Sequence, residues 1–219
     1  GGVRRSAMIS LSDLNDRDMA LAKSGAWWEG NNFRSLANNS AIYDSKPSLG
    51  QFLSEWSSLY DSKSGERGIF NREGASDRMT EQGRPSESIG TNPCGEILLK
   101  SMQMCNLSEV IIRPTDNVTT IKKKVEIATI IGTCQSKLTD FPYLRKRWEY
   151  NCNEDRLLGV SMTGIFDNPI TWGKDGLGKL AHRLERWRDH SVKVNLEWSQ
   201  KIGVKPSKAI TTIKPSGTV

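Results

Sequence analysis

Long apolar runs, paired cysteines and histidines are all scarce in this 219-residue chain. Its longest apolar stretches span only a few residues, whereas a membrane-spanning helix needs roughly 20. No segment has the charged, apolar and small-residue order of a signal peptide. The four cysteines form no CxxC pair and only two histidines are present, so no metal site is predicted. We therefore expect a cytoplasmic protein with reduced thiols and no membrane partner.

The excess of basic residues is small and dispersed, with 31 Lys and Arg against 25 Asp and Glu. Scattered positive charge suits an anionic nucleotide substrate, although it more often forms only a solvated surface. The chain has no repeated aromatic-basic pattern of the kind that a nucleic-acid groove needs. We therefore expect no nucleic-acid partner.

Helical and strand-like patterns alternate along the chain. Apolar residues recur at helical spacing over residues 48–60, 117–138 and 180–202, which predicts three helices. Short apolar runs at 157–164 and 209–213 predict strands that alternate with them. This alternation predicts an α/β fold, and no clear linker divides the chain, so we expect a single domain over its whole length.

Less regular stretches lie between these elements. Residues 25–32 are predicted to be a loop, and residues 142–147 a turn before Cys152. Cys134, near the end of the second predicted helix, is expected to be a small buried apolar residue. Neither Cys134 nor Cys152 suggests a catalytic role.

An amide, a thiol and a carboxylate stand at alternate positions in Asn92, Cys94 and Glu96. In an extended segment they would point to the same side, yet a cysteine between Pro93 and Gly95 is typical of an exposed turn. The nearby carboxylate disfavours a thiolate nucleophile, and no histidine lies close in sequence to act as a base. A thiol beside a carboxylate suits hydrogen-atom chemistry better than acyl transfer. An ordinary loop with an incidental cysteine is the alternative that spacing alone leaves open.

This stretch resembles the active-site finger loop of ribonucleotide reductase large subunits. The resemblance rests on NPCGE at 92–96 and CNL at 105–107, with Cys105 eleven residues after Cys94. Further matching motifs are GGVR at 1–4, SGERGIFNR at 64–72, LGV at 158–160 and KPSGT at 214–218. The resemblance therefore covers essentially the whole chain, and it is closest to the adenosylcobalamin-dependent class, in its monomeric, triphosphate-reducing type.

The resemblance implies a fold and a set of residue roles. The fold would be part of a ten-stranded α/β barrel, with the finger loop near residues 90–106. Cys94 would carry the thiyl radical that abstracts the substrate's 3′ hydrogen, Glu96 would take the 3′-hydroxyl proton, and Asn92 would orient the ribose. Cys105 would be one of two thiols that reduce the 2′ position and end as a disulfide, its partner lying outside this chain.

A second implied site lies at the end of the chain. Pro215, Ser216, Gly217 and Thr218 follow a predicted strand, and a glycine-containing turn there offers backbone N–H groups and hydroxyls to an anion. Such a turn is usually only a turn. The resemblance implies that this one holds the substrate phosphates.

The implied function is that of a ribonucleoside-triphosphate reductase, which makes 2′-deoxyribonucleotides for DNA synthesis by thiyl-radical chemistry. It implies adenosylcobalamin as cofactor, thioredoxin or a similar dithiol as reductant, and a dNTP effector bound outside this chain. The chain begins at Gly1 without a methionine and stops at Val219, so we expect a fragment that is inactive alone. The alternatives are a di-iron-dependent reductase subunit and an inactive nucleotide-binding remnant.

Overall fold

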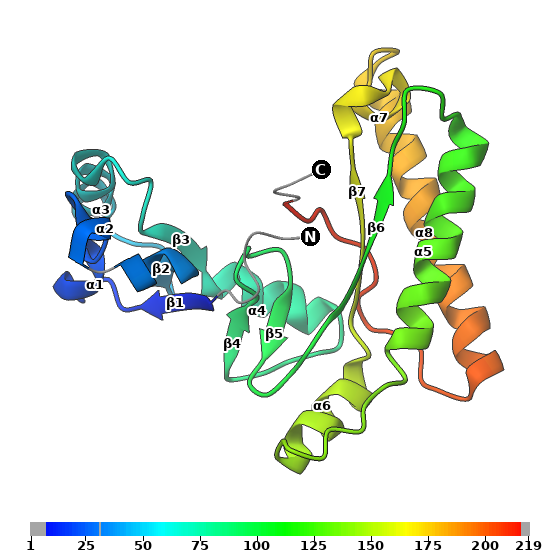
Figure 1. Cartoon of the computed structure of the whole chain (residues 1–219), viewed down its shortest axis with the longest axis horizontal. Coiled ribbons are helices and arrows are strands. Elements are labelled where there is room, and N and C mark those ends of the chain that lie inside the picture. Colours follow the sequence, from blue (N-terminus) through cyan, green and yellow to red (C-terminus); the bar gives the residue numbers. More distant parts are fainter. Residues whose placement is uncertain (1–7, 31, 216–219) are drawn as a thin grey trace. The chain divides into compact units, whose positions relative to one another are not determined.

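The computed structural model describes residues 8–30 and 32–215. The chain divides into two compact units, Gly1–Leu98 and Leu99–Val219, whose elements are labelled in Figure 1. The expectation of a single domain over residues 1–219 stays a prediction.

The first unit is built on a three-stranded parallel sheet in the order β1-β2-β3. Its strands are β1 (Met8–Ser12), β2 (Ala37–Tyr43) and β3 (Gly68–Asn71). Its helical segments are α1 (Arg17–Leu21), α2 (Trp27–Gly30), the 3-10 turn η1 (Asn32–Leu36), α3 (Leu49–Ser62) and α4 (Arg72–Glu81). A separate two-stranded sheet consists of β4 (Ile89–Thr91) and β5 (Leu98–Lys100).

The longest helix of this unit, α3, confirms the prediction for residues 48–60. It begins with a capping box, in which the Ser48 side chain accepts a bond from the Gln51 N–H and the Gln51 side chain accepts one from the Ser48 N–H. It ends at Lys63, which adopts a left-handed conformation with φ 53°. These signals fix both ends of the helix.

The interior of the first unit combines a small apolar cluster with buried charged side chains. Among the described residues, the cluster has three buried members, Ala75, Met79 and Ile89. Arg67 is buried and donates to both carboxylate oxygens of Glu55, at 2.7 and 3.0 Å. The same guanidinium donates to the Ser12 hydroxyl and to two backbone carbonyls, those of residues 13 and 14.

The second unit contains a parallel strand pair covered by helices. Its strands are β6 (Asn106–Ile111) and β7 (Leu158–Thr163), which pair along their whole lengths. Its helical segments are α5 (Val118–Gln135), α6 (Lys146–Asp155), the 3-10 turn η2 (Ile165–Asp167), α7 (Pro169–Trp172) and α8 (Leu177–Ile202). In Figure 1, α5 and α8 lie side by side along the strand pair.

An apolar core joins these helices to the strands. It has nine buried residues: Val110, Ile112, Ile121, Val125, Ala128, Leu158, Val160, Trp187 and Ile210. Removing such side chains from water stabilises a fold by about 1.5–3 kcal/mol for each large residue. The core therefore holds α5 and α8 on the strand pair.

Most of the predicted elements are confirmed, and several are wrong. The helices predicted over 117–138 and 180–202 are α5 and α8, and the strand at 157–164 is β7. Residues 209–213 make only one strand bridge, between Thr211 and Val160.

The loop predicted at 25–32 contains α2, and Asn31 within it lies outside the described residues. The turn predicted at 142–147 runs into α6. Cys134 is exposed, not buried as predicted, because it lies on the outer side of the last turns of α5.

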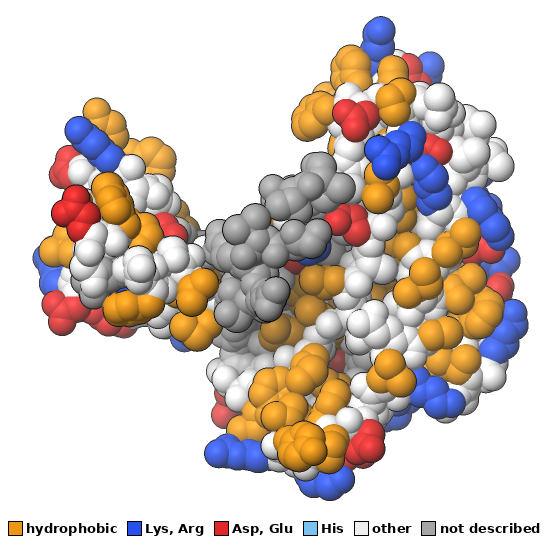
Figure 2. Space-filling model, viewed as in Figure 1, with side chains coloured by type: hydrophobic (Ala, Val, Ile, Leu, Met, Phe, Trp, Pro, Cys, Tyr) orange, Lys and Arg blue, Asp and Glu red, His pale blue; other side chains and the backbone are white. Residues whose placement is uncertain are grey.

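The surface shows no single charged patch on the face in view. Figure 2 shows Lys and Arg side chains scattered over the second unit, among exposed hydrophobic ones. Scattered apolar exposure is normal for folded chains. Among the described residues, no helix is both long and apolar enough to cross a membrane.

Candidate functional site

The segment that carries Asn92, Cys94 and Glu96 is a turn between β4 and β5. The Asn92 N–H donates to the Ile97 carbonyl at 3.3 Å, and the Gly95 N–H donates to the Asn92 carbonyl at 3.0 Å. Gly95 has φ 84°, a left-handed conformation that glycine adopts without steric cost. The extended arrangement was therefore wrong, and the exposed turn expected from the Pro-Cys-Gly sequence is confirmed.

Cys94 is exposed within this turn, whereas Asn92 and Glu96 are half-buried. The Asn92 side-chain oxygen accepts a bond from the Ile97 N–H at 3.0 Å and another from the Thr91 hydroxyl at 3.3 Å. These bonds close the base of the loop. An external reagent can therefore reach the thiol while the loop itself stays ordered.

The loop is also anchored from outside. The side-chain amide of Asn38, on β2, donates to the Pro93 carbonyl. Asn38 lies in the parallel sheet of the first unit, opposite Ile9. The sheet therefore fixes the residue immediately before Cys94.

Cys105 lies in the second unit, directly before β6, and is half-buried. The next residue, Asn106, begins the strand pairing, since its N–H donates to the Leu157 carbonyl at 2.9 Å. Its side-chain amide donates to the same carbonyl at 3.1 Å. Cys105 is thus held at the amino end of a parallel strand pair in which β6 is half-buried and β7 is mostly buried.

The strand segment that leads to Pro215 runs alongside β7. The Val160 N–H donates to the Ile210 carbonyl at 2.8 Å, and the Thr212 N–H donates to the Val160 carbonyl at 3.0 Å. The Lys214 N–H then donates to the hydroxyl of Ser161 at 2.8 Å. Pro215 follows and is exposed, whereas the predicted phosphate contacts Ser216, Gly217 and Thr218 lie outside the described residues.

The parallel direction of these strands separates two predicted site residues within the second unit. Cys105 precedes β6, and Pro215 follows the segment paired with β7. They therefore lie toward opposite ends of the paired strands.

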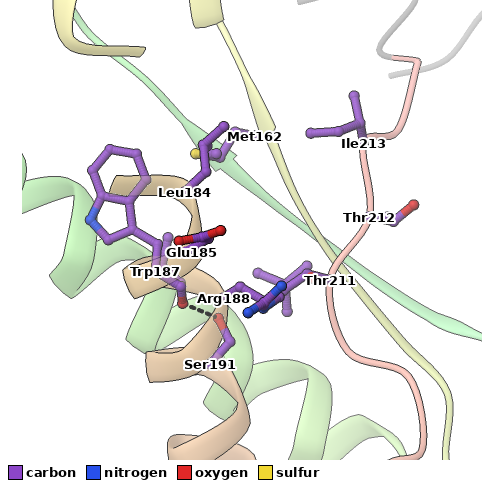
Figure 3. A pocket seen from close by; sticks show the side chains of 11 residues that line it. Met162, Leu184, Glu185, Trp187, Arg188, Ser191, Thr211, Thr212 and Ile213 are labelled. Atoms are coloured by element: carbon purple, nitrogen blue, oxygen red, sulfur yellow. Dashed lines mark hydrogen bonds between the residues drawn. The ribbon is translucent and has the colours of Figure 1, made fainter. Parts of the chain in front are cut away.

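A cavity that the sequence did not reveal lies beside this last segment. It has a volume of about 360 Å³. In Figure 3, side chains of α8, among them Leu184 and Trp187, form one wall, Met162 of β7 lies behind them, and residues 211–213 form the opposite wall. Its lining is mostly apolar, with Glu185 and Arg188 as its charged members. The helical spacing of the α8 residues was visible in the sequence, but the cavity depends on the segment facing them.

The remaining thiol, Cys152, is buried in α6, and burial raises its pKa. A raised thiol pKa keeps it protonated and unreactive at neutral pH.

Among the described residues, no cluster of three or more His, Cys, Asp or Glu could hold a metal ion.

Comparison with known proteins identifies relatives over the full chain, although no family model matches. An adenosylcobalamin-dependent ribonucleoside-triphosphate reductase of Lacticaseibacillus paracasei is 29% identical over 256 residues. Proteins of the same name from Lactobacillus gasseri and Lactobacillus leichmannii are each 28% identical, over 256 and 255 residues. In each case the match covers 100% of this chain and 32% of the relative.

The chain is similar over its whole length to adenosylcobalamin-dependent ribonucleoside-triphosphate reductases. It spans about a third of the length of the curated relatives that it matches. A crystal structure of a B12-dependent (class II) ribonucleotide reductase matches 95% of this chain, with a TM-score of 0.67 and 23% identity, and the match covers 32% of the solved chain. This likeness confirms the predicted fold class, because the present chain has an α/β fold that corresponds to part of the reductase barrel.

Proposed function

We propose that the chain is part of the catalytic chain of an adenosylcobalamin-dependent ribonucleoside-triphosphate reductase. Such an enzyme converts ribonucleoside triphosphates to 2′-deoxyribonucleotides for DNA synthesis by thiyl-radical chemistry. The observation that carries the proposal is similarity over the entire chain to reductases of that name. Their names also favour this function over a di-iron-dependent reductase and over an inactive remnant.

Cys94 is the proposed radical residue. Its exposed position in an ordered turn suits a sulfur that must reach one C–H bond of a bound ribose. As a thiyl radical it would take the 3′ hydrogen atom, becoming a thiol and leaving a carbon radical on the sugar. The atom is returned at the end of the reaction, so Cys94 is regenerated.

Glu96 and Asn92 are the proposed acid–base and orienting residues. The Glu96 carboxylate would accept the 3′-hydroxyl proton. The Asn92 oxygen already accepts bonds from the Thr91 hydroxyl and the Ile97 N–H. We therefore assign the ribose contact to its NH₂ group, which can only donate.

Cys105 is the proposed reducing thiol. Together with a second thiol outside this chain, it would supply two electrons and two protons to the 2′ position. The 2′ oxygen would leave as water, and the two sulfurs would end joined in a disulfide. Thioredoxin or a similar dithiol would return that disulfide to two thiols.

Pro215 and the following Ser216, Gly217 and Thr218 are the proposed phosphate contacts. Support comes from the strand segment that delivers them, which is paired with β7 as far as Lys214. A backbone turn after such a strand presents N–H groups to an anion. A dNTP effector would bind outside this chain.

The proposed cofactor, adenosylcobalamin, supplies an organic radical when bound. The exposed thiol of Cys94 fits that requirement, because a radical source must come close to the sulfur. No residue of this chain is assigned to holding the cofactor. We place the enzyme in the cytoplasm, where thiols are kept reduced.

The proposal is tested with the full-length protein by measuring dNTP formation from ribonucleoside triphosphates with adenosylcobalamin and a dithiol. Cys94→Ser is expected to reduce the product to background, whereas Cys134→Ser, which changes an exposed thiol on α5, retains full activity. Full activity of Cys94→Ser would overturn the catalytic role. Activity that requires a second, metal-containing subunit in place of adenosylcobalamin would overturn the cofactor. The 219-residue chain alone is expected to form no dNTP.

A further inference from the structure

A buried carboxylate that the proposed reaction does not use lies at the end of α6. Asp155 has 0% of its side chain exposed. An isolated buried charge is strongly unfavourable, so such a group is normally paired and hydrogen-bonded. Its partners come from two segments, residues 100–103 and residue 208, that are far apart in the sequence.

The first segment is the one that leads into Cys105. The Lys100 ammonium lies 3.0 Å from the Asp155 Oδ2 atom, and the Gln103 side-chain amide donates to the same oxygen at 2.8 Å. The Gln103 side-chain oxygen in turn accepts the Lys100 N–H at 3.0 Å. One carboxylate oxygen therefore holds both ends of this four-residue stretch.

Neighbouring residues of α6 hold the rest of the segment. The Asn151 side-chain amide donates to the carbonyls of Ser101 and Met102, at 2.8 and 3.2 Å. The Met104 N–H donates to the Cys152 sulfur at 3.4 Å. Because Met102 has φ 55°, a conformation unfavourable for a side-chain-bearing residue, the segment needs these contacts to keep its path.

The second segment is the one that leads to Pro215. The Lys208 N–H donates to the backbone carbonyl of Asp155 at 2.9 Å. The Lys208 ammonium lies 3.3 Å from the Asp155 Oδ1 atom. Lys208 directly precedes the residues that pair with β7.

We infer that Asp155 is a positioning residue that ties the Cys105 segment to the strand segment leading to Pro215. Its Oδ2 atom contacts Lys100 and Gln103 of the first segment, and its Oδ1 atom lies 3.3 Å from Lys208 of the second. The significance for catalysis rests on the proposed function, because only there are Cys105 and Pro215 site residues. The tie itself is a property of the fold and can be measured without turnover.

The test is hydrogen exchange of the full-length protein, read by mass spectrometry over residues 100–106 and 207–214, together with the alkylation rate of Cys105. Asp155→Asn is expected to raise exchange in both segments and alkylation of Cys105 roughly tenfold, equal to about 1.4 kcal/mol of local opening. Exchange within α5 is expected to stay unchanged. An increase in only one segment, in neither, or equally throughout the unit would overturn the inference.

Single-lysine variants separate the two halves of the tie. Lys100→Met is expected to loosen only residues 100–106, and Lys208→Met only residues 207–214. Lys100→Arg restores a cation and is expected to rescue both the exchange rate and the Cys105 alkylation rate, a recovery that a purely steric role of Lys100 would not give. These variants also decide the inference if Asp155→Asn fails to fold. Loosening of both segments by either single-lysine variant would contradict the inference that each lysine holds its own segment.

A matched control is Glu154→Gln. Glu154 precedes Asp155 and pairs with Lys205 and Lys208, at 2.7 and 3.8 Å. It is expected to leave residues 100–106 and Cys105 unchanged, and an effect equal to that of Asp155→Asn would overturn the inference. Absence of dNTP formation by the unmodified protein would refute the proposed function while leaving these exchange results valid.

Discussion

The two units of this chain differ in the size of their apolar clusters and in the charges that they bury. In the first, the fully or nearly buried side chains include three cations, Lys23, Arg67 and Arg84, of which Arg84 is only 1% exposed. In the second, nine apolar residues form one core between the strand pair and its helices. The first unit therefore depends more on its buried ion pairs, whereas the second has a larger apolar core and buries the paired Asp155 beside it.

The buried cations of the first unit each have hydrogen-bond acceptors. Lys23 bonds the Ala37 carbonyl and lies 2.8 Å from a Glu66 oxygen, and Arg84 donates to the Leu98 carbonyl at 2.9 Å. A buried charge with such partners is tolerated, but it becomes very unfavourable when one partner is removed. We therefore predict that removing one buried polar partner lowers the stability of the first unit about as much as creating a cavity lowers that of the second.

The largest expected effect follows from Arg67→Met. The change leaves the Glu55 carboxylate without its bidentate partner and removes the donor from three other oxygens, so we expect a loss of about 3–5 kcal/mol. Urea-dependent hydrogen exchange, read separately for each unit, measures it. The control is Arg72→Met, whose exposed ion pair with Asp44 contributes less than about 1 kcal/mol. Equal losses of stability in Arg67→Met and Arg72→Met would contradict the stabilising role of the buried polar contacts.

The corresponding change in the second unit is Leu158→Ala. Leu158 is 1% exposed within the apolar core, and truncating such a side chain costs about 2–5 kcal/mol, depending on how far the cavity collapses. The same exchange experiment should show this loss in α5, β6 and β7. Exposed Leu177, at the start of α8, serves as the control, and Leu177→Ala should have little effect.

A smaller effect is expected at the start of α5. The Asn117 side chain accepts bonds from the Thr119 and Thr120 N–H groups, at 2.9 and 3.0 Å. Asn117→Ala removes this cap and is expected to cost about 1 kcal/mol. Asn117→Asp, which keeps an acceptor, should retain stability in urea unfolding. If both variants lose the same stability, the cap does not contribute.

The smallest expected effect is a pH dependence at the surface of the second unit. The bond from Arg183 lowers the pKa of Asp175 from 3.8 to about 2. A depressed carboxyl pKa adds stability above the ordinary value, and that contribution is lost as the pH falls from about 4 through about 2. The stability difference between the native chain and Asp175→Asn should therefore vanish below about pH 2. A difference that persists there would show that the ion pair is not its cause.

The elements that the sequence predicted well are those whose apolar residues follow a regular period. α8 was expected over 180–202 and spans Leu177–Ile202, because its apolar positions recur at helical spacing and Gly203 ends it. α6 was missed because its sequence, KRWEYNCNED, is mostly polar. It is held by contacts to residues 100–106 instead of by an apolar face.

The turn at the candidate site was predictable from the sequence, whereas the long-range contacts near it were not. The Pro-Cys-Gly sequence indicated an exposed turn, and the structure has one at Cys94. The burial of Asp155 was not predictable, because it depends on Lys100 and Lys208, which approach only when the chain is folded. Long-range polar contacts leave no periodic signal in a sequence.

The turn around Cys94 has a further consequence for protein engineering. Three of its closing bonds run between residues 92 and 97 themselves, through the backbone and side chain of Asn92 and the N–H of Gly95. The conformation is therefore encoded largely within the loop, with one further bond from Asn38 to the Pro93 carbonyl. Residues 89–100, grafted onto the end of a hairpin in an unrelated scaffold, would carry the spacing of thiol and carboxylate with them.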